Sequence, residues 1–137
     1  MEPPSETSPT PREGVVGFTP ETIGWTPHPF APGLDQAVLL SKRDHGADAT
    51  IYLYRASGAG FAPTVDGEAV DVPLHEHEAS DDISYVLAGS AEVDIEGHGT
   101  IVLGPGSFLR IPAGSRHRVR NVSDDFQALN IFAPPRD

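Results

Sequence analysis

The chain contains no cysteine, which excludes disulfide bonds, thiolate metal ligands and cysteine nucleophiles. No apolar run approaches the roughly 20 residues that a membrane-spanning helix needs. The N-terminus lacks the basic head and apolar stretch of a signal peptide, so we expect a soluble cytoplasmic protein. Lysine occurs once, and the formal net charge is −11. Nucleic acids and anionic membranes are therefore poor partners for this chain.

The length of 137 residues suits one domain with a core of its own. Residues 1–14 hold four of the fourteen prolines among Ser, Thr and Glu, which predicts a disordered, flexible tail. Residues 15–36 place Phe18, Trp25 and Phe30 among further prolines, which favours an extended arm packed on the domain by its aromatic rings. Residues 37–137 are predicted to form the domain itself.

The domain is predicted to be all-β. Short runs rich in β-branched and aromatic residues alternate with Gly or Pro turns, and no helical period persists for 11 or more residues. Many short antiparallel strands in one domain indicate a sandwich or a barrel, with a jelly roll among the leading choices. The predicted strands are 37–42, 50–56, 83–89, 91–97, 100–104, 107–112, 117–122 and 128–134.

Two histidines one residue apart suggest a metal site. In a strand, His75 and His77 point to the same face, and their side chains, roughly 6–7 Å apart along the strand, can converge on one ion. Asp82 follows after four residues, enough for a turn that brings the next strand alongside. By themselves, such histidines are more typical of a surface loop, so a further ligand has to come from elsewhere in the chain.

That ligand lies in a second patterned segment, and here the sequence resembles a known family. The pattern H-x-H-x4-D-x6-G from His75 to Gly89 resembles the first cupin motif, with Asp82 where the family has Glu and Ala69 where it has an opening Gly. The pattern G-x5-P-x-G-x2-H-x3-N, residues 106–121, matches the second cupin motif at every fixed position. The resemblance implies a cupin-type jelly-roll β-barrel with turn glycines at positions 89, 106 and 114. It also implies one divalent transition metal ion bound by His75, His77, Asp82 and His117, with Asp81 as the competing carboxylate.

Nitrogen and oxygen ligands suit Fe, Mn, Ni, Co, Cu or Zn and do not choose among them. The resemblance implies a metal-dependent enzyme acting on a small-molecule substrate, with redox-neutral Lewis-acid chemistry of the isomerase, lyase or cyclase type, in sugar or natural-product metabolism, as the leading hypothesis. The alternatives are a dioxygenase that uses Fe(II) or Cu(II) and O2, and a non-catalytic ligand-binding or sensor module. Single-domain members of the family commonly dimerise, so a homodimer is also expected.

Other side chains carry weaker predictions. Tyr52 and Tyr54 share one strand face and are weak catalytic candidates, as is Arg110 if it faces the cavity and holds a substrate carboxylate. His28, beside prolines, is predicted to have a turn or surface role, as are His45 and His98. Three arginines at positions 116, 118 and 120 share the strand face opposite His117 and are expected to pair with carboxylates.

Overall fold

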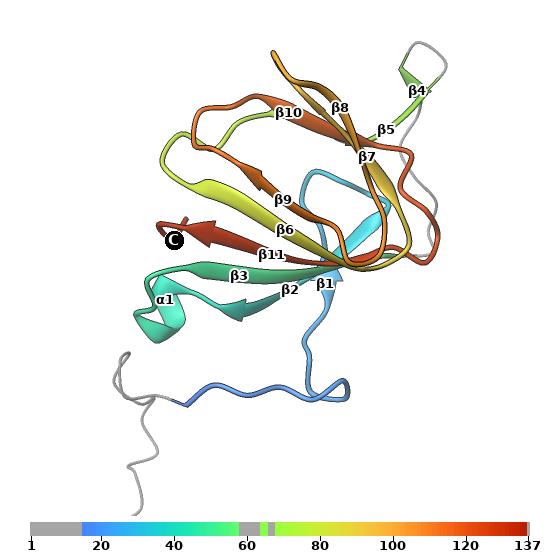
Figure 1. Cartoon of the computed structure of the whole chain (residues 1–137). Helices are drawn as coiled ribbons and strands as arrows, with labels where there is room; N and C mark the ends of the chain where they lie inside the picture. Colours follow the sequence, from blue (N-terminus) through green and yellow to red (C-terminus); the bar gives the residue numbers. More distant parts are fainter. Residues whose placement is uncertain (1–14, 58–63, 66–67, 137) are drawn as a thin grey trace, which may run out of the picture.

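The computed structural model describes residues 15–57, 64–65 and 68–136. The predicted tail, residues 1–14, lies outside the described part. Figure 1 shows the described residues as strands joined by short turns. They are β1 (Thr26–Pro27), β2 (Leu34–Leu40), α1 (Lys42–His45), β3 (Thr50–Ala56), β4 (Thr64–Val65), β5 (Glu68–His75), β6 (Asp81–Ala88), β7 (Ala91–Ile95), β8 (Gly99–Leu103), β9 (Phe108–Ile111), β10 (His117–Arg120) and β11 (Gln127–Ala133).

The strands form two antiparallel sheets. The first has the order β1-β2-β3-β11-β6-β9 and the second the order β4-β5-β10-β7-β8, so strands distant in the sequence become neighbours. Apolar side chains of both sheets fill the space between them, among them Val86, Val93, Leu109 and Phe126. This arrangement confirms the predicted all-β jelly roll.

All eight predicted strands are present, and none of their ends is shifted by more than three residues. Two further elements are present. β5 carries an alternation of Val70, Val72 and Leu74 that Pro73 interrupts, so the run was not predicted as a full strand. α1, also not predicted, is a single helical turn after Ser41, whose hydroxyl accepts a hydrogen bond from the backbone N–H of Asp44. No helix in the described part of the chain is long and apolar enough to span a membrane.

The N-terminal arm lies along the first sheet. β1 pairs with β2, and the predicted boundary at residue 36 falls inside β2. Trp25 anchors the arm, because the Arg55 guanidinium lies 4.0 Å from the centre of its indole ring. Phe18 and Phe30 remain exposed, so the expectation that all three aromatic rings pack on the domain is wrong for these two.

Candidate metal centre and its cavity

Three imidazoles meet between the two sheets. His117, the first residue of β10, lies directly opposite His75, the last residue of β5, in the strand register. His77 follows two residues after β5 ends. The structure brings one ring nitrogen from each histidine to within 4.8 Å of the others. The histidines of the two motifs therefore lie together, although His77 reaches the cluster from a loop and not from the strand.

Backbone carbonyls fix the orientation of two of these rings. Nδ1 of His75 lies 2.7 Å from the carbonyl oxygen of Pro73, and Nδ1 of His117 lies 3.0 Å from that of Ser115. Because a carbonyl oxygen only accepts, each Nδ1 must carry the proton and donate it. In the neutral form of each ring Nε2 then carries the lone pair, which is the tautomer a metal ligand requires.

Asp82, in β6, lies beside the histidines. Its Oδ2 is 3.4 Å from Nε2 of His117 and 3.6 Å from Nε2 of His77. Its Oδ1 accepts a hydrogen bond of 2.9 Å from the amide of Asn130, on the neighbouring strand β11. The second N–H of that amide donates to Ser84 at 2.8 Å, so Asn130 holds Asp82 with Oδ2 facing the rings.

The electrostatics of the cluster fit a carboxylate among imidazoles. Burial acts to raise the pKa of Asp82, but hydrogen bonds and charge from His117 and His77 outweigh it and lower the pKa to about 2. Burial opposes protonation of His117, yet the hydrogen bond to Asp82 raises its pKa. Burial lowers the pKa of His75, which favours its neutral, ligating form.

The residues present fit a divalent metal ion. Two donor atoms that each lie about 2.0–2.1 Å from one ion are roughly 2.8–3.4 Å apart in octahedral or tetrahedral geometry. The distances from Asp82 Oδ2 to the two Nε2 atoms are close to that range. The third imidazole, that of His75, has a ring nitrogen within 4.8 Å of a ring nitrogen of each of the other two.

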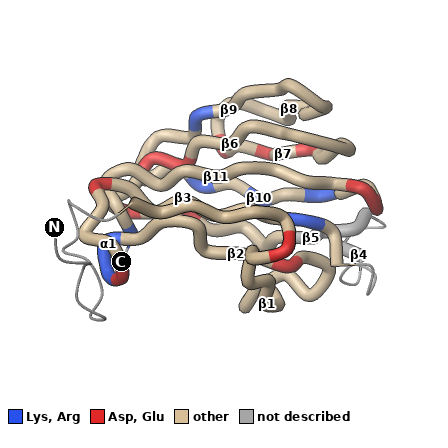
Figure 2. The backbone as a smooth tube through the Cα atoms, turned by 90° about the horizontal axis from the view of Figure 1, so that it is seen from below, with Lys and Arg blue, Asp and Glu red and all other residues tan. Residues whose placement is uncertain are grey.

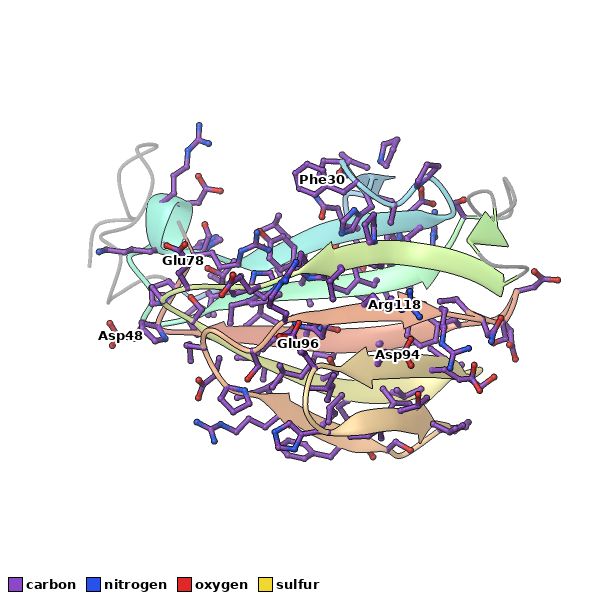
Figure 3. All side chains as sticks on the ribbon, turned by 90° about the horizontal axis from the view of Figure 1, so that it is seen from above. Phe30, Asp48, Glu78, Asp94, Glu96 and Arg118 are labelled. Carbon is purple, nitrogen blue, oxygen red and sulfur yellow. The ribbon has the colours of Figure 1, made fainter. Side chains whose placement is uncertain are left out.

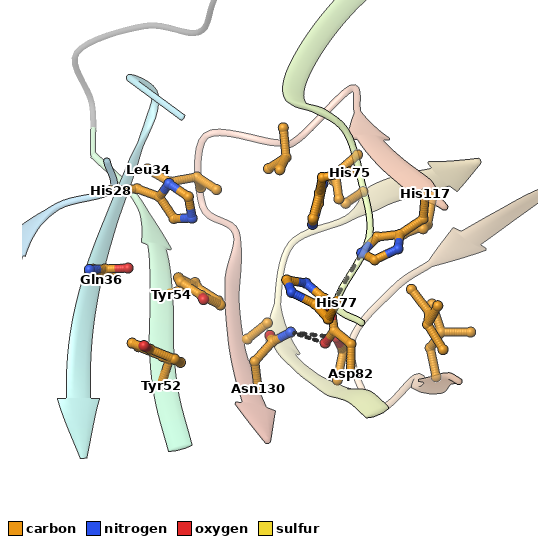
Figure 4. A pocket seen from close by; sticks show the side chains of 18 of the residues that line it. His28, Leu34, Gln36, Tyr52, Tyr54, His75, His77, Asp82, His117 and Asn130 are labelled. Carbon is orange, nitrogen blue, oxygen red and sulfur yellow. Dashed lines mark hydrogen bonds and ion pairs between the residues drawn. The ribbon is translucent and has the colours of Figure 1, made fainter. Parts of the chain in front are cut away.

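The cluster forms one wall of a cavity of about 500 Å³ lined mainly by apolar side chains. Figure 4 shows Tyr52, Tyr54 and His28 on the wall opposite the cluster. Aromatic rings connect the two walls: Tyr52 stacks on Tyr54 with ring centres 5.6 Å apart, and Phe132 contacts both Tyr52 and His77 edge to face. Such a lining suits a small, largely apolar organic molecule.

The remaining predicted site residues divide into two groups. Tyr52 and Tyr54 line the cavity, as their shared strand face predicts. Arg110 is not among the lining residues; its guanidinium donates to Asp81 at 2.7 Å on the outer surface. Asp81 also accepts a hydrogen bond from the backbone N–H of Ala113. These contacts turn Asp81 away from the cluster, so Asp82 is the carboxylate that faces the histidines.

Sequence reasoning missed four residues that line the cavity. Strand alternation would turn Glu76 away from the histidines on either side of it, but the strand ends at His75 and Glu76 lines the cavity. His28 was assigned a surface or turn role, and Asn130 and Arg136 were not singled out at all. His28 comes from the arm, Asn130 from the middle of β11 and Arg136 from beyond its end. Only the pairing of the strands brings these three residues to the cavity. No motif in the sequence marks them.

Outside the cavity, the arginines of β10 pair with carboxylates as predicted. Asp94 Oδ2 accepts from Arg118 at 2.7 Å and from Arg120 at 2.8 Å, and Arg116 lies 3.7 Å from Glu96. Figure 2 shows the basic positions of β10 beside acidic positions of β7, and Figure 3 shows Arg118 next to Asp94. This network covers the outer face of the second sheet.

A family model described as a cupin domain matches residues 61–132, just over half of the chain. The chain therefore belongs to the cupin family. The jelly roll and the two motifs agree with this assignment.

Two curated proteins match parts of the chain. Dimethylsulfoniopropionate lyase DddQ of Ruegeria pomeroyi is 42% identical over 60 residues, which are 44% of this chain and 29% of that protein. Polyketide synthase CurC of Streptomyces cyaneus is 43% identical over 73 residues, which are 53% of this chain and 45% of that protein. The matched segments thus span less than half the length of either relative.

Solved structures resemble nearly the whole chain. KdgF from Halomonas sp. is 25% identical with a TM-score of 0.66, over 88% of this chain and 95% of that one. The polyketide cyclase RemF from Streptomyces resistomycificus is 20% identical with a TM-score of 0.67, over 88% of this chain and 80% of that one. At 20% identity the likeness to RemF shows the fold alone.

Proposed function

We propose that this cupin is a metal-dependent enzyme acting on a small organic molecule, with His75, His77, His117 and Asp82 as ligands of one divalent transition metal ion. One observation carries the proposal: the Nδ1 atoms of His75 and His117 are tied to backbone carbonyls, which leaves the Nε2 lone pairs directed into the cluster. A binding barrel with structural histidines has no need of this arrangement. Cupins typically bind a metal ion, which supports the same assignment.

We infer redox-neutral chemistry of the lyase, isomerase or cyclase type. When bound, the ion supplies a Lewis acid that polarises a carbonyl or enolate oxygen. The names of the curated relatives, a lyase and a polyketide synthase, support this class. A small-molecule substrate fits the size and apolar lining of the cavity.

The chain's own residues position the substrate. Burial, together with the charge of Asp82, raises the pKa of Tyr54 far above neutrality, so its hydroxyl stays protonated and acts as a hydrogen-bond donor. The described residues offer that hydroxyl no partner, which leaves it available to a substrate oxygen. Apolar lining residues such as Val86, Leu109 and Phe132 exclude water from the reacting atoms.

The metal content of protein purified without a metal-affinity tag tests the proposal. We expect close to one equivalent of a transition metal in the wild type and in His98→Ala, since His98 is an exposed turn histidine outside the cluster. His75→Ala should lose the metal. If His98→Ala and His75→Ala retain it equally, or the wild type takes up none after reconstitution, the proposed site is wrong.

The same preparations separate the reaction classes and test the fourth ligand. If the protein holds iron or copper and consumes O2 with a substrate, it belongs to the dioxygenase class. Zinc, nickel or manganese without O2 uptake supports Lewis-acid chemistry. If Asp82→Ala keeps the metal that His75→Ala loses, the site consists of three histidines alone.

We also propose that the protein forms a homodimer through the outer face of the first sheet. Tyr85, Leu87 and Phe108 are 46%, 47% and 66% exposed there, and Tyr85 lies directly opposite Phe108 in the sheet. In light scattering after size exclusion, Leu87→Glu should halve the mass. Val102→Glu, an exposed position on the second sheet, should leave the mass unchanged. A wild type with monomer mass at all concentrations would contradict the dimer.

A further inference from the structure

Arg136 is the one arginine or lysine among the described residues that line the cavity. Its guanidinium carbon lies 4.8 Å from the centre of the Phe132 ring, and no described carboxylate pairs with it. Five other arginines each pair with an acidic side chain, namely Arg55, Arg110, Arg116, Arg118 and Arg120. Arg136 is therefore a cavity cation whose hydrogen-bond donors are available to a ligand.

His28 adds a neutral donor to the lining of the same cavity, near enough to Arg136 for that charge to act on its ring. Its Nδ1 accepts a hydrogen bond of 3.0 Å from the backbone N–H of Phe30, so that nitrogen carries no proton. Burial, followed by the charges of His75 and Arg136, lowers the pKa of His28 to about 4, so the ring is neutral near pH 7. The proton then sits on Nε2, which has no partner among the described residues.

The cavity lining next to His28 is aromatic. The rings of His28 and Tyr54 are 5.6 Å apart, and Tyr52 and Tyr54 stack at an interplanar angle of 12°. Phe30 lines the mouth while 69% exposed, so a ligand there would cover it. Flat, unsaturated molecules pack best against such a surface.

The charge balance favours an anion once the proposed metal is bound. Glu76 and Asp82 are the carboxylates that line the cavity, and Arg136 is its arginine. A divalent ion in the cluster outweighs the remaining negative charge and makes the cavity positive. The histidine cluster and Arg136 both line this one cavity, so a single acid can contact both.

We propose that the substrate is a flat, unsaturated carboxylic acid whose carboxylate is bound by Arg136 and the Nε2–H of His28, with its body against Tyr54 and Tyr52 and its reacting end toward the histidine cluster. Only the placement of the reacting end at the histidine cluster rests on the proposed function. It names the substrate class and assigns specificity to two residues outside both cupin motifs.

Calorimetric titration of the full-length, zinc-loaded protein with trans-cinnamate and with its neutral counterpart trans-cinnamamide tests the inference. We expect the wild type to bind the acid more tightly than the amide, and Arg136→Gln to weaken acid binding by about 10-fold while leaving amide binding unchanged. His28→Phe, which keeps an aromatic ring but removes the N–H, should weaken acid binding by roughly 3- to 10-fold. Arg110→Gln, a change on the outer surface, should affect neither ligand.

Three results would overturn the inference: no binding of cinnamate by the wild type, an equal loss for acid and amide in Arg136→Gln, or unchanged acid binding in Arg136→Gln. If acid binding is unchanged in Arg136→Gln but is lost when zinc is removed, the carboxylate binds at the histidine cluster and not at Arg136. The metal content of each preparation keeps the two proposals separate. A wild type that holds no metal but prefers the acid through Arg136 contradicts the proposed function and supports the anion site.

Discussion

Asn130 and Asp82 are 48 residues apart in the chain, yet the amide of Asn130 donates a 2.9 Å hydrogen bond to Oδ1 of Asp82 inside the cavity. The other N–H of the same amide donates to Ser84. The pairing of β11 with β6 places Asn130 directly opposite Ser84, which fixes both contacts. Asn130 therefore positions the carboxylate that faces the histidines, although it belongs to neither cupin motif.

Replacing Asn130 with Ala should weaken metal binding by about 10- to 100-fold, because the carboxylate loses the partner that orients it. Ser84→Ala is the matched control, since it removes the second acceptor and leaves the bond to Asp82 intact. It should change the affinity by less than about 3-fold. Competition with a chromophoric chelator measures both values. Equal losses in the two variants would show that Asn130 acts through the general packing of the cavity and not through Asp82.

The adjacent aspartates offer a second, isosteric comparison. Asp82→Asn should lower metal affinity by at least about 10-fold, because a neutral amide replaces the carboxylate that we propose as a ligand. Asp81→Asn should leave metal binding unchanged, since Asp81 bonds the Arg110 guanidinium and the Ala113 N–H on the outer surface. Metal titration of both proteins decides the matter. The reverse order of effects would make Asp81 the ligand.

Gly89 ends β6 with a positive φ of 72°, and a Cβ there would lie 2.7 Å from the backbone Cα of Phe126. Gly89→Ala should therefore lower the free energy of unfolding by roughly 3 kcal/mol or more, from both backbone strain and steric overlap. Gly106 is the control, with a φ of 84° and open space around it, so Gly106→Ala should cost only about 1–2 kcal/mol. Urea denaturation measures the difference. Equal costs would mean that the turn after β6 shifts to accept the methyl group.

The sequence predicted the parts of the site that local chemistry fixes. Alternating β-branched and aromatic residues predicted the strands, because each strand buries one face. The second motif predicted where His117 lies, because Gly106, Pro112 and Gly114 constrain the turns that lead into β10. Gly106 and Gly114 have the positive φ values that such turns require.

The residues that the sequence did not predict depend on pairing between distant segments. Arg110 faces outward because its strand register places Leu109 and Ile111 on the cavity side. His28 reaches the cavity because β1 pairs with β2 and turns the following residues inward. Neither register can be predicted from one strand alone. The position of His28 in the cavity lining is therefore known only from the folded chain.

The stability of the metal-free protein should also depend on pH through Asp94. Burial acts to raise the pKa of Asp94, but hydrogen bonds from Thr100, Arg118 and Arg120 outweigh it and lower the pKa to about 2. A carboxyl group whose pKa is lowered by folding stabilises the protein above its unfolded pKa, near 4. That stabilisation is lost as the pH falls through the folded pKa.

Asp94→Asn should therefore be less stable than the wild type by about 1 kcal/mol at pH 6, a value below the full linkage energy because solvent screens this surface network. The deficit should shrink between pH 4 and pH 2, where the wild-type carboxylate becomes protonated and resembles the amide. Asp124→Asn removes one negative charge at an exposed turn residue and controls for net charge. Urea denaturation in the presence of a chelator at pH 6, 4, 3 and 2 measures the trend. A deficit that stays constant over this range would mean that the arginines of β10 gain nothing from the charge of Asp94.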